Sequence, residues 1–121
     1  MSIQLYTTLN RNQFQSIIDK PNISVLVFLN AQWCGPCKSV KPFIYQRLSI
    51  LKNYPQVIVF DIDIDQPENR DIYSFFKTKK QLTGVPTLLY FKDSIYSELC
   101  VSGDNKKGID DLFLKIIEQN K

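Results

Sequence analysis

The chain has 121 residues, 44% of them hydrophobic and 22% charged, which is the composition of a single globular domain over residues 1–121. It contains no histidine. This absence excludes a Ser-His-Asp hydrolase, a Cys-His protease and a zinc or haem site with a histidine ligand. A formal charge of +3 is too small to predict a nucleic-acid-binding face, so we expect no polynucleotide partner.

The N-terminal segment and the cysteine content indicate in which cellular compartment the protein is found. Residues 1–8 lack the apolar core of a secretory signal, and no apolar stretch reaches the roughly 20 residues that cross a bilayer. The 3 cysteines are too few for a disulfide scaffold. We therefore predict a cytoplasmic protein with no membrane partner.

The first half of the chain alternates between strand and helix patterns. A short strand is expected around Leu5, followed by a helix that begins after Asn10 as N-cap and ends before Pro21. The continuous apolar run over residues 24–29 predicts a central strand covered on both faces. Apolar residues then recur at helical spacing over residues 40–51, which predicts a second helix.

The second half continues this alternation. Residues 57–60 predict a buried strand, and residues 67–76 predict a helix with a proline in its first turn. Residues 87–91 and 95–101 are typical of two strands joined by a tight turn, which makes them antiparallel.

The last predicted helix carries apolar residues on one face over residues 109–117, with Asp104 or Asn105 as its cap. The complete order is strand-helix-strand-helix-strand-helix-strand-strand-helix. This order predicts an α/β fold in which a mixed sheet has helices on both faces.

The candidate catalytic centre is Trp33-Cys34-Gly35-Pro36-Cys37-Lys38, at the carboxyl end of the first central strand. Open α/β sheets usually bind ligands at this edge. Two cysteines three residues apart in the first turn of a helix can close a small disulfide ring. Cys34 lies nearest the free N–H groups and the positive end of the helix dipole, which favour a thiolate over a thiol. We therefore assign Cys34 as the nucleophile and Cys37 as the resolving thiol.

A Cys-x-x-Cys pair can also be half of a zinc site. The chain offers only one further cysteine, Cys100, and no histidine, so four ligands of this kind cannot be assembled. We predict no metal and no other cofactor. Cys100 lies among alternating apolar residues and is interpreted as a strand residue rather than a regulatory thiol.

The Cys-Gly-Pro-Cys motif, Pro42 and the segment Gly84-Val85-Pro86-Thr87 together resemble the thioredoxin family, over essentially the whole chain. The resemblance implies a thioredoxin fold, a three-layer sandwich with a central mixed sheet of about five strands and four helices. It also implies that Pro86 is a cis-proline facing the two cysteines. By similarity, a shallow surface that pairs with substrate backbone includes Trp33, Gly35, Pro36, Val85, Pro86 and Gly103.

The resemblance implies a protein-disulfide reductase that works by dithiol–disulfide exchange and serves electron transport and cell redox homeostasis. Its partners would be disulfide-containing proteins and an external reductase such as a thioredoxin reductase, and a monomer is expected. Oxidases and isomerases of this fold typically carry a histidine between the cysteines, whereas Gly35-Pro36 favours a reductase. The alternative is an interaction module of the same fold, which holds a partner on the Trp33–Pro86 surface with little or no redox turnover.

One position departs from the family pattern. Thioredoxins usually carry a buried aspartate beneath the second cysteine, and in this chain that position is Phe28. Asp61 or Asp63, on the neighbouring predicted strand, is a possible acceptor for the proton of Cys37, because residues two apart share one face of a strand. The alternative is that these aspartates, together with Asp65, are solvated residues at the end of a strand.

Overall fold

The computed structural model describes residues 5–80, 82, 84–93 and 98–121. The elements follow the predicted order. They are β1 (Leu5–Tyr6), α1 (Arg11–Ile18), β2 (Ser24–Asn30), α2 (Gly35–Leu48), β3 (Val57–Asp63), α3 (Arg70–Lys80), β4 (Thr87–Lys92), β5 (Glu98–Ser102) and α4 (Lys106–Gln119).

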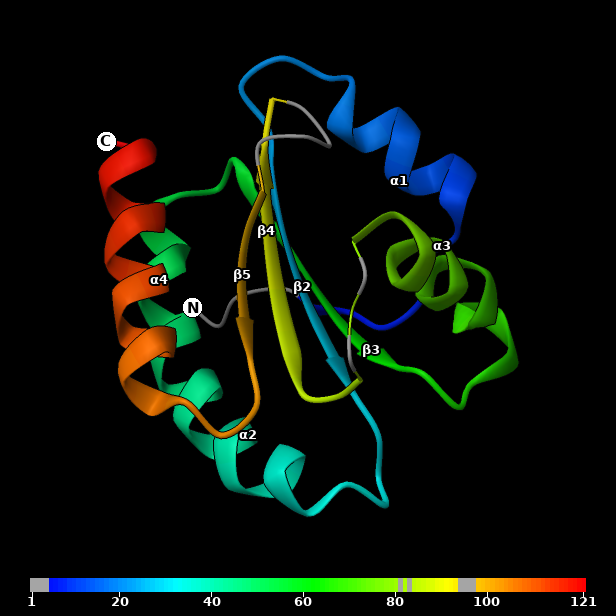
Figure 1. The fold of residues 1–121 in the computed structure, drawn as a ribbon. Coiled ribbons are helices and arrows are strands. Elements are labelled where there is room, and N and C mark those ends of the chain that lie inside the picture. Colours follow the sequence, from blue (N-terminus) through cyan, green and yellow to red (C-terminus); the bar gives the residue numbers. More distant parts are fainter. Residues whose placement is uncertain (1–4, 81, 83, 94–97) are drawn as a thin grey trace.

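The strands form one mixed sheet in the order β1-β3-β2-β4-β5. The pairs β1·β3 and β2·β3 are parallel, while β4 runs antiparallel to both β2 and β5. α1 and α3 cover one face of the sheet, and α2 and α4 cover the other (Figure 1). The three-layer α/β architecture expected from the sequence is confirmed.

β2 occupies the centre of the sheet, and all of its residues are buried. Its side chains alternate between two hydrophobic clusters: Val25 and Val27 pack with α1 and α3, whereas Leu26 and Phe28 pack with α2 and α4. Burial on both faces explains why this strand reads as a continuous apolar run instead of an alternating pattern.

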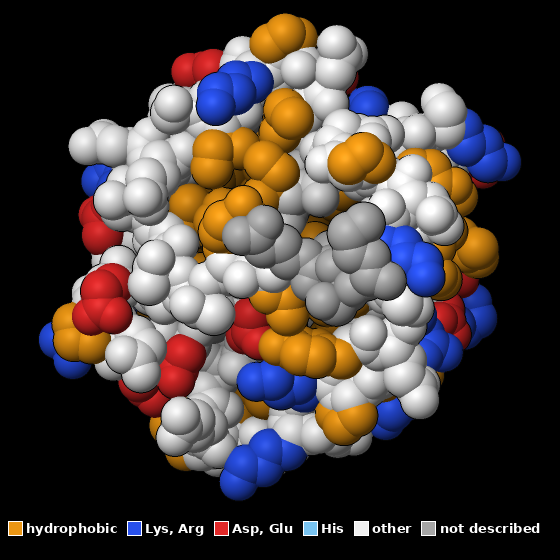
Figure 2. All heavy atoms as spheres, turned by 180° about the vertical axis from the view of Figure 1, so that it is seen from behind, with side chains coloured by type: hydrophobic (Ala, Val, Ile, Leu, Met, Phe, Trp, Pro, Cys, Tyr) orange, Lys and Arg blue, Asp and Glu red, His pale blue; other side chains and the backbone are white. Residues whose placement is uncertain are grey.

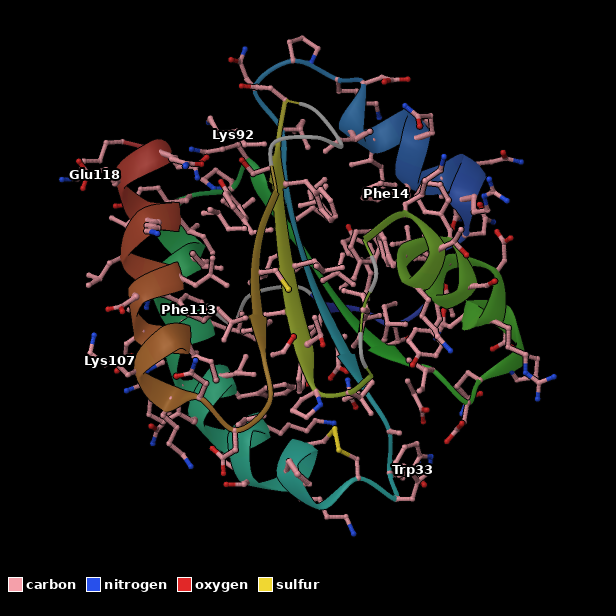
Figure 3. The ribbon with its side chains drawn as sticks, in the orientation of Figure 1. Phe14, Trp33, Lys92, Lys107, Phe113 and Glu118 are labelled. Atoms are coloured by element: carbon pink, nitrogen blue, oxygen red, sulfur yellow. A yellow bond between two sulfur atoms is a disulfide. The ribbon has the colours of Figure 1, made fainter. Side chains whose placement is uncertain are left out.

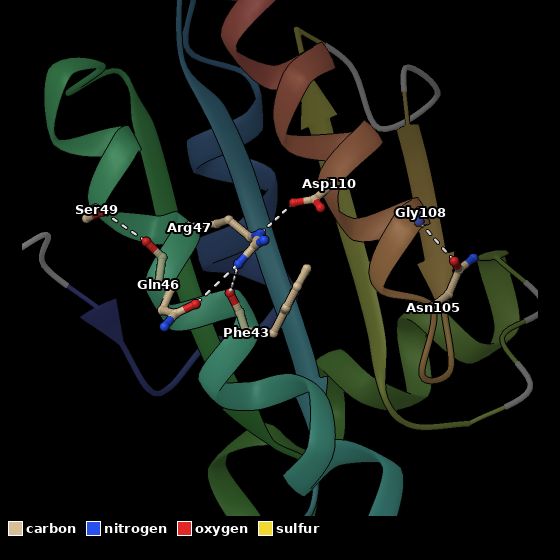
Figure 4. Close-up of polar contacts among 7 residues, drawn as sticks. All are labelled: Phe43, Gln46, Arg47, Ser49, Asn105, Gly108 and Asp110. Atoms are coloured by element: carbon tan, nitrogen blue, oxygen red, sulfur yellow. Dashed lines mark hydrogen bonds and ion pairs between the residues drawn. The ribbon is translucent and has the colours of Figure 1, made fainter.

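Side-chain caps define the starts of two helices. Asn10 caps α1, accepting the N–H of Gln13 at 2.8 Å, while the Gln13 amide oxygen accepts the Asn10 N–H at 3.0 Å. For α4 the cap is Asn105, whose side-chain oxygen accepts the N–H of Gly108 at 2.9 Å (Figure 4). Asp104, the other candidate, instead accepts a hydrogen bond from Ser39 on α2.

Several predicted boundaries differ from the structure. The strand expected over residues 57–60 extends to Asp63, and the helix expected over residues 67–76 is a short 3₁₀ helix, Pro67–Asn69, followed by α3 over Arg70–Lys80.

α2 begins at Gly35, as expected from the position of the two cysteines, and passes through Pro42. It ends at Leu48 instead of continuing to residue 51, so that Leu51 lies in a short 3₁₀ helix, Ser49–Asn53. The last strand was expected from residue 95. β5 begins at Glu98, and residues 95–97 lie outside the described part of the chain.

α2, which begins directly after Cys34 and contains Cys37, is joined to α4 by Arg47. The Arg47 Nε atom forms an ion pair with the Asp110 carboxylate, and its Nη1 atom donates to the Phe43 carbonyl at 3.2 Å (Figure 4). The guanidinium also stacks over the Phe43 ring, 3.3 Å from the ring centroid.

Cys100 lies in β5, as expected, and its side chain is exposed. Over the described residues, no helix has both the length and the apolar character that crossing a bilayer requires.

Candidate active site

The two motif cysteines lie at the N-terminus of α2, at one end of the molecule and near the labelled Trp33 (Figure 3). They form a disulfide with 5.2 Å between their Cα atoms. The loop from β2 positions Cys34 as the N-cap of α2, where its N–H donates to the Ala31 carbonyl at 3.2 Å. The Cys-x-x-Cys spacing therefore places both sulfur atoms in the first turn of the helix.

The helix terminus distinguishes the two sulfur atoms. In the disulfide state both residues are buried, at 4% exposure for Cys34 and 3% for Cys37, so accessibility alone does not separate them. The Cys34 Sγ atom accepts the backbone N–H of Cys37 at 3.1 Å. A free N–H group and the helix dipole both stabilise negative charge at that sulfur.

The segment before β4 lies against Cys34. The Val85–Pro86 peptide is cis, as expected, and the Cys34 Sγ atom lies 3.8 Å from the Val85 carbonyl oxygen. Gly84 adopts a φ of 146°, a conformation that favours glycine, and its carbonyl accepts the Thr87 hydroxyl at 2.8 Å. The Gly103 N–H donates to the Pro86 carbonyl at 2.9 Å, which brings the loop before α4 to the same place.

The predicted substrate surface is unevenly exposed. Trp33 is 67% exposed, Gly35 and Pro36 are also exposed, and Val85 and Gly103 are half-buried. Pro86 is buried. Pro86 therefore shapes the backbone beside Cys34 and offers little surface of its own.

The Trp33 indole N–H donates to an Asp65 carboxylate oxygen at 2.7 Å. Asp65 follows β3, and the carboxyl ends of the parallel strands β2 and β3 lie at the same edge of the sheet. Sequence reasoning placed Asp65 only among solvated strand-end residues and missed this contact. The parallel pairing of the two predicted strands was the signal that could have indicated it.

The two candidate proton acceptors have different surroundings. Asp61 has a side chain that is 12% exposed and faces α2, where it contacts Tyr45 and Lys41. Asp63 instead accepts the backbone N–H of Asp65 at 2.9 Å, within its own loop. Only Asp61 is thus linked to the helix that carries the cysteines by a contact within the described residues.

Among the described residues, three groups bind the Asp61 carboxylate. Asn30 donates from Nδ2 to Oδ1 at 2.7 Å, the Tyr45 hydroxyl donates to Oδ2, and Lys41 Nζ lies 3.6 Å from Oδ2. The side chain of Tyr45 is partly exposed, but its partial burial raises its pKa well above the usual range, and the hydrogen bond to Asp61 raises it further. Sequence reasoning did not identify these three partners, although Lys41 and Tyr45 follow Cys37 at four and eight residues, on one side of a helix.

A second polar contact joins α2 to the loop before α4. The Ser39 hydroxyl donates to Asp104 at 2.9 Å, and Lys106 Nζ donates to the other carboxylate oxygen of Asp104 at 3.1 Å. The hydrogen bond from Ser39, followed by that from Lys106, holds the pKa of Asp104 below its usual range. This contact steadies the loop that contains Gly103.

A groove of about 590 Å³ lies elsewhere, between α1 and the β1–β3 side of the sheet. Figure 2, which views the molecule from behind, shows hydrophobic side chains gathered around a hollow on that face. The groove contains none of the predicted site residues. It is lined by Tyr6, Thr8, Leu9, Asn12, Gln13, Ser16, Ile17, Ile58 and Phe60.

The chain is similar to known proteins over most of its length. Residues 5–115 match the family model named Thioredoxin. The sequence is 36% identical over 93 residues to Thioredoxin 1 of Plasmodium falciparum, covering 72% of this chain and 86% of that protein. It is 33% identical over 84 residues to thioredoxin of Homo sapiens, covering 69% of this chain and 71% of that protein.

Two solved structures extend the comparison. Plasmodium falciparum thioredoxin has a TM-score of 0.64 at 28% identity, covering 93% of this chain and 98% of that one. Oxidized thioredoxin O2 from Arabidopsis thaliana has a TM-score of 0.69 and covers 100% of both chains. At 22% identity, that second likeness concerns the fold alone.

Proposed function

The chain belongs to the thioredoxin family, and on that premise we propose that it is a protein-disulfide reductase acting as an electron carrier. The observation that carries this proposal is the Cys34–Cys37 disulfide at the N-terminus of α2, against the Val85–Pro86 segment. Family membership and the close cysteine pair indicate dithiol–disulfide redox chemistry. The preference for reduction rests on Gly35-Pro36, which supplies no charged or imidazole group between the cysteines.

In the first step, the Cys34 thiolate attacks one sulfur of a target disulfide. A mixed disulfide forms between Cys34 and the target, and the second target sulfur leaves as a thiolate. The N–H of Cys37, which contacts Cys34 Sγ at 3.1 Å, supports the charge of the attacking thiolate.

In the second step, Cys37 loses its proton and attacks the Cys34 sulfur of the mixed disulfide. The Cys34–Cys37 disulfide forms as the bond between Cys34 and the target breaks, and the target sulfur that was bonded to Cys34 leaves as a thiolate. The target gains two electrons, which the cysteine pair loses. An external reductase, such as a thioredoxin reductase, then returns two electrons to the pair.

Protein substrates fit the shape of the site. We propose that the exposed Trp33 and the half-buried Val85 and Gly103 contribute to a shallow surface that takes an extended backbone segment. We expect the protein to act as a monomer in the cytoplasm. Because one relative, Thioredoxin O1 of Arabidopsis thaliana at 35% identity, is named as mitochondrial, imaging of the tagged full chain is the test of location.

Reduction of insulin disulfides by dithiothreitol tests the proposal. The wild-type chain should accelerate insulin precipitation, and so should Cys100→Ser as the matched control. Cys34→Ser should abolish the acceleration. Cys37→Ser should form a stable mixed disulfide with the target, visible as an adduct on a non-reducing gel.

The same assay separates the alternative function. If the folded wild-type chain gives no acceleration over dithiothreitol alone, the reductase proposal fails and the interaction module is favoured. Binding of a partner that is equally strong in the oxidised chain and in a Cys34→Ser/Cys37→Ser variant would then support the module.

A further inference from the structure

The second step of the proposed reaction requires a proton acceptor near Cys37, and the groups around this thiol are largely apolar. Cys37 is 3% exposed and belongs to a hydrophobic cluster that includes Leu29 and Ala31. Phe28 lies in the other cluster, packed with Val40 of α2. The void beside Phe28 measures about 10 Å³, which is at most the space of one water molecule. Among the described residues, the lining of this void supplies no acidic or basic side chain.

A polar side chain suited to accept the proton lies on the neighbouring strand, β3. Phe28 pairs in register with Asp61, which faces α2 and has little solvent exposure. The groups on α2 that touch Asp61 are Lys41 and Tyr45, one and two turns after Cys37. Asp61 therefore lies beneath the side of α2 that also carries Cys37.

The hydrogen bonds of Asn30 give independent support for a proton acceptor at Asp61. It is 6% exposed, and its Nδ2 atom donates to Asp61 Oδ1 at 2.7 Å and lies 3.2 Å from the Phe28 carbonyl. Because both of these partners are acceptors, the atom that contacts them is the amide nitrogen. The other terminal atom of the side chain is therefore the oxygen, Oδ1. Within the described residues no donor reaches Asn30 Oδ1, and a buried acceptor of this kind normally has a donor.

We propose that Asp61 receives the proton of Cys37 during the resolving step, through a water molecule held by Asn30. Asn30 is a positioning residue, since its N–H fixes Asp61 while its Oδ1 accepts from the water. This inference rests on the proposed function. Cys37 gives its proton to Asp61, its sulfur bonds to Cys34, and the target sulfur leaves as a thiolate. The proton then passes from Asp61 to solvent on the side where Tyr45 and Lys41 are exposed.

The other carboxylates near the site are engaged elsewhere. Asp65 is exposed and accepts from Trp33, and Asp104 is exposed and accepts from Ser39 and Lys106. Asp63 bonds the backbone of its own loop. The titratable groups facing Asp61 are Tyr45 and Lys41 from α2, with Asp63 next along the same face of β3, while β2 contributes the uncharged Phe28 and Asn30.

Single-turnover reaction of the reduced chain with dithiobis(nitrobenzoate) separates the two steps. Attack by Cys34 releases one coloured nitrothiobenzoate, at a rate that depends on reagent concentration. Attack by Cys37 releases the second, at a rate that does not. Nitrothiobenzoate is a weak base and does not take the proton of Cys37 itself, so the protein's own acceptor limits the second release.

Asp61→Asn should leave the first release within about twofold of wild type and slow the second at least about fivefold near neutral pH, because general bases usually contribute more than this. The slowing should become smaller as the pH rises above the ordinary thiol pKa near ~8.5, because solvent hydroxide then competes with the protein's own acceptor for the proton. Asp63→Asn is the matched control and should change neither release by more than about twofold.

Three results would overturn the inference: an unchanged second release in Asp61→Asn, a slowing that is equal at every pH, or an equal slowing in Asp63→Asn. If Asp61→Asn does not fold, Tyr45→Phe is the variant that tests the inference. Without the hydroxyl donor Asp61 becomes a better base, so a faster second release supports the inference, and an unchanged or slower one refutes it. Absence of the first release overturns the proposed function, and this inference with it.

Discussion

The hydrogen bond between Trp33 and Asp65 is expected to control how the proposed substrate surface is presented. Trp33 is 67% exposed, so few packing contacts restrain its ring, and within the described residues its indole N–H is held by Asp65 at 2.7 Å. Substitution of Asp65 by alanine removes the acceptor. The ring should then sample other rotamers, and the surface beside Cys34 should lose its largest exposed apolar group for part of the time.

The size of the effect follows from the geometry. A hydrogen bond to a charged acceptor contributes about 1.5–3 kcal/mol when it is shielded from water, and solvent screening at this exposed position reduces the figure to roughly 0.5–1.5 kcal/mol. This lowers the ratio of the observed ring position to all others by about two- to twelvefold. We expect KM for insulin to rise by no more than this factor, with kcat nearly unchanged, because the cysteines do not contact Asp65.

The chain has 1 tryptophan, so its fluorescence reports on Trp33 directly. The decay of fluorescence anisotropy should acquire a larger fast component in Asp65→Ala than in wild type. Asp65→Asn, which retains an acceptor oxygen, is the matched control and should lie between the two. An unchanged anisotropy decay, or a fall in kcat with KM unchanged, would refute the reasoning.

Two further predictions concern stability. Tyr90 is fully buried, donates to Ser24 at 2.9 Å and accepts from Asn120 at 2.8 Å, so Tyr90→Phe leaves a buried N–H without a partner. It should lower the free energy of unfolding by about 2–3 kcal/mol and the Tm by roughly 10 °C, as measured by urea and thermal denaturation; a loss below about 0.5 kcal/mol would contradict this. The raised pKa of Tyr45 means that its stabilisation is fully present below the ordinary tyrosine pKa near ~10 and is lost as the pH rises above it. The urea midpoint of the wild-type protein should therefore fall as the pH rises above this value, and the fall should be smaller in Tyr45→Phe. An equal fall of the midpoint in the two proteins would contradict the prediction.

Local patterns in the sequence were sufficient for the element order and for the cysteine pair. Three features depend only on residues that are neighbours in the sequence: the apolar run of β2, the capping residue Asn10 and the Cys-Gly-Pro-Cys motif. The end of the second helix was predicted wrongly at Leu51 because only local spacing was used. Apolar residues keep their helical spacing beyond Leu48, although the chain forms a 3₁₀ helix there. Periodicity does not distinguish these two helical forms over a single turn.

By itself, then, the sequence determined the sandwich architecture, the central strand and the position of the two cysteines at the start of a helix. Only the tertiary structure decided which aspartate faces α2, which residue holds Trp33 and which of Asp104 and Asn105 caps α4. These choices depend on contacts between strands and helices that are distant in sequence. Such contacts follow from strand register and helix packing, and a shift of one residue in register would turn every side chain of β3 to the opposite face.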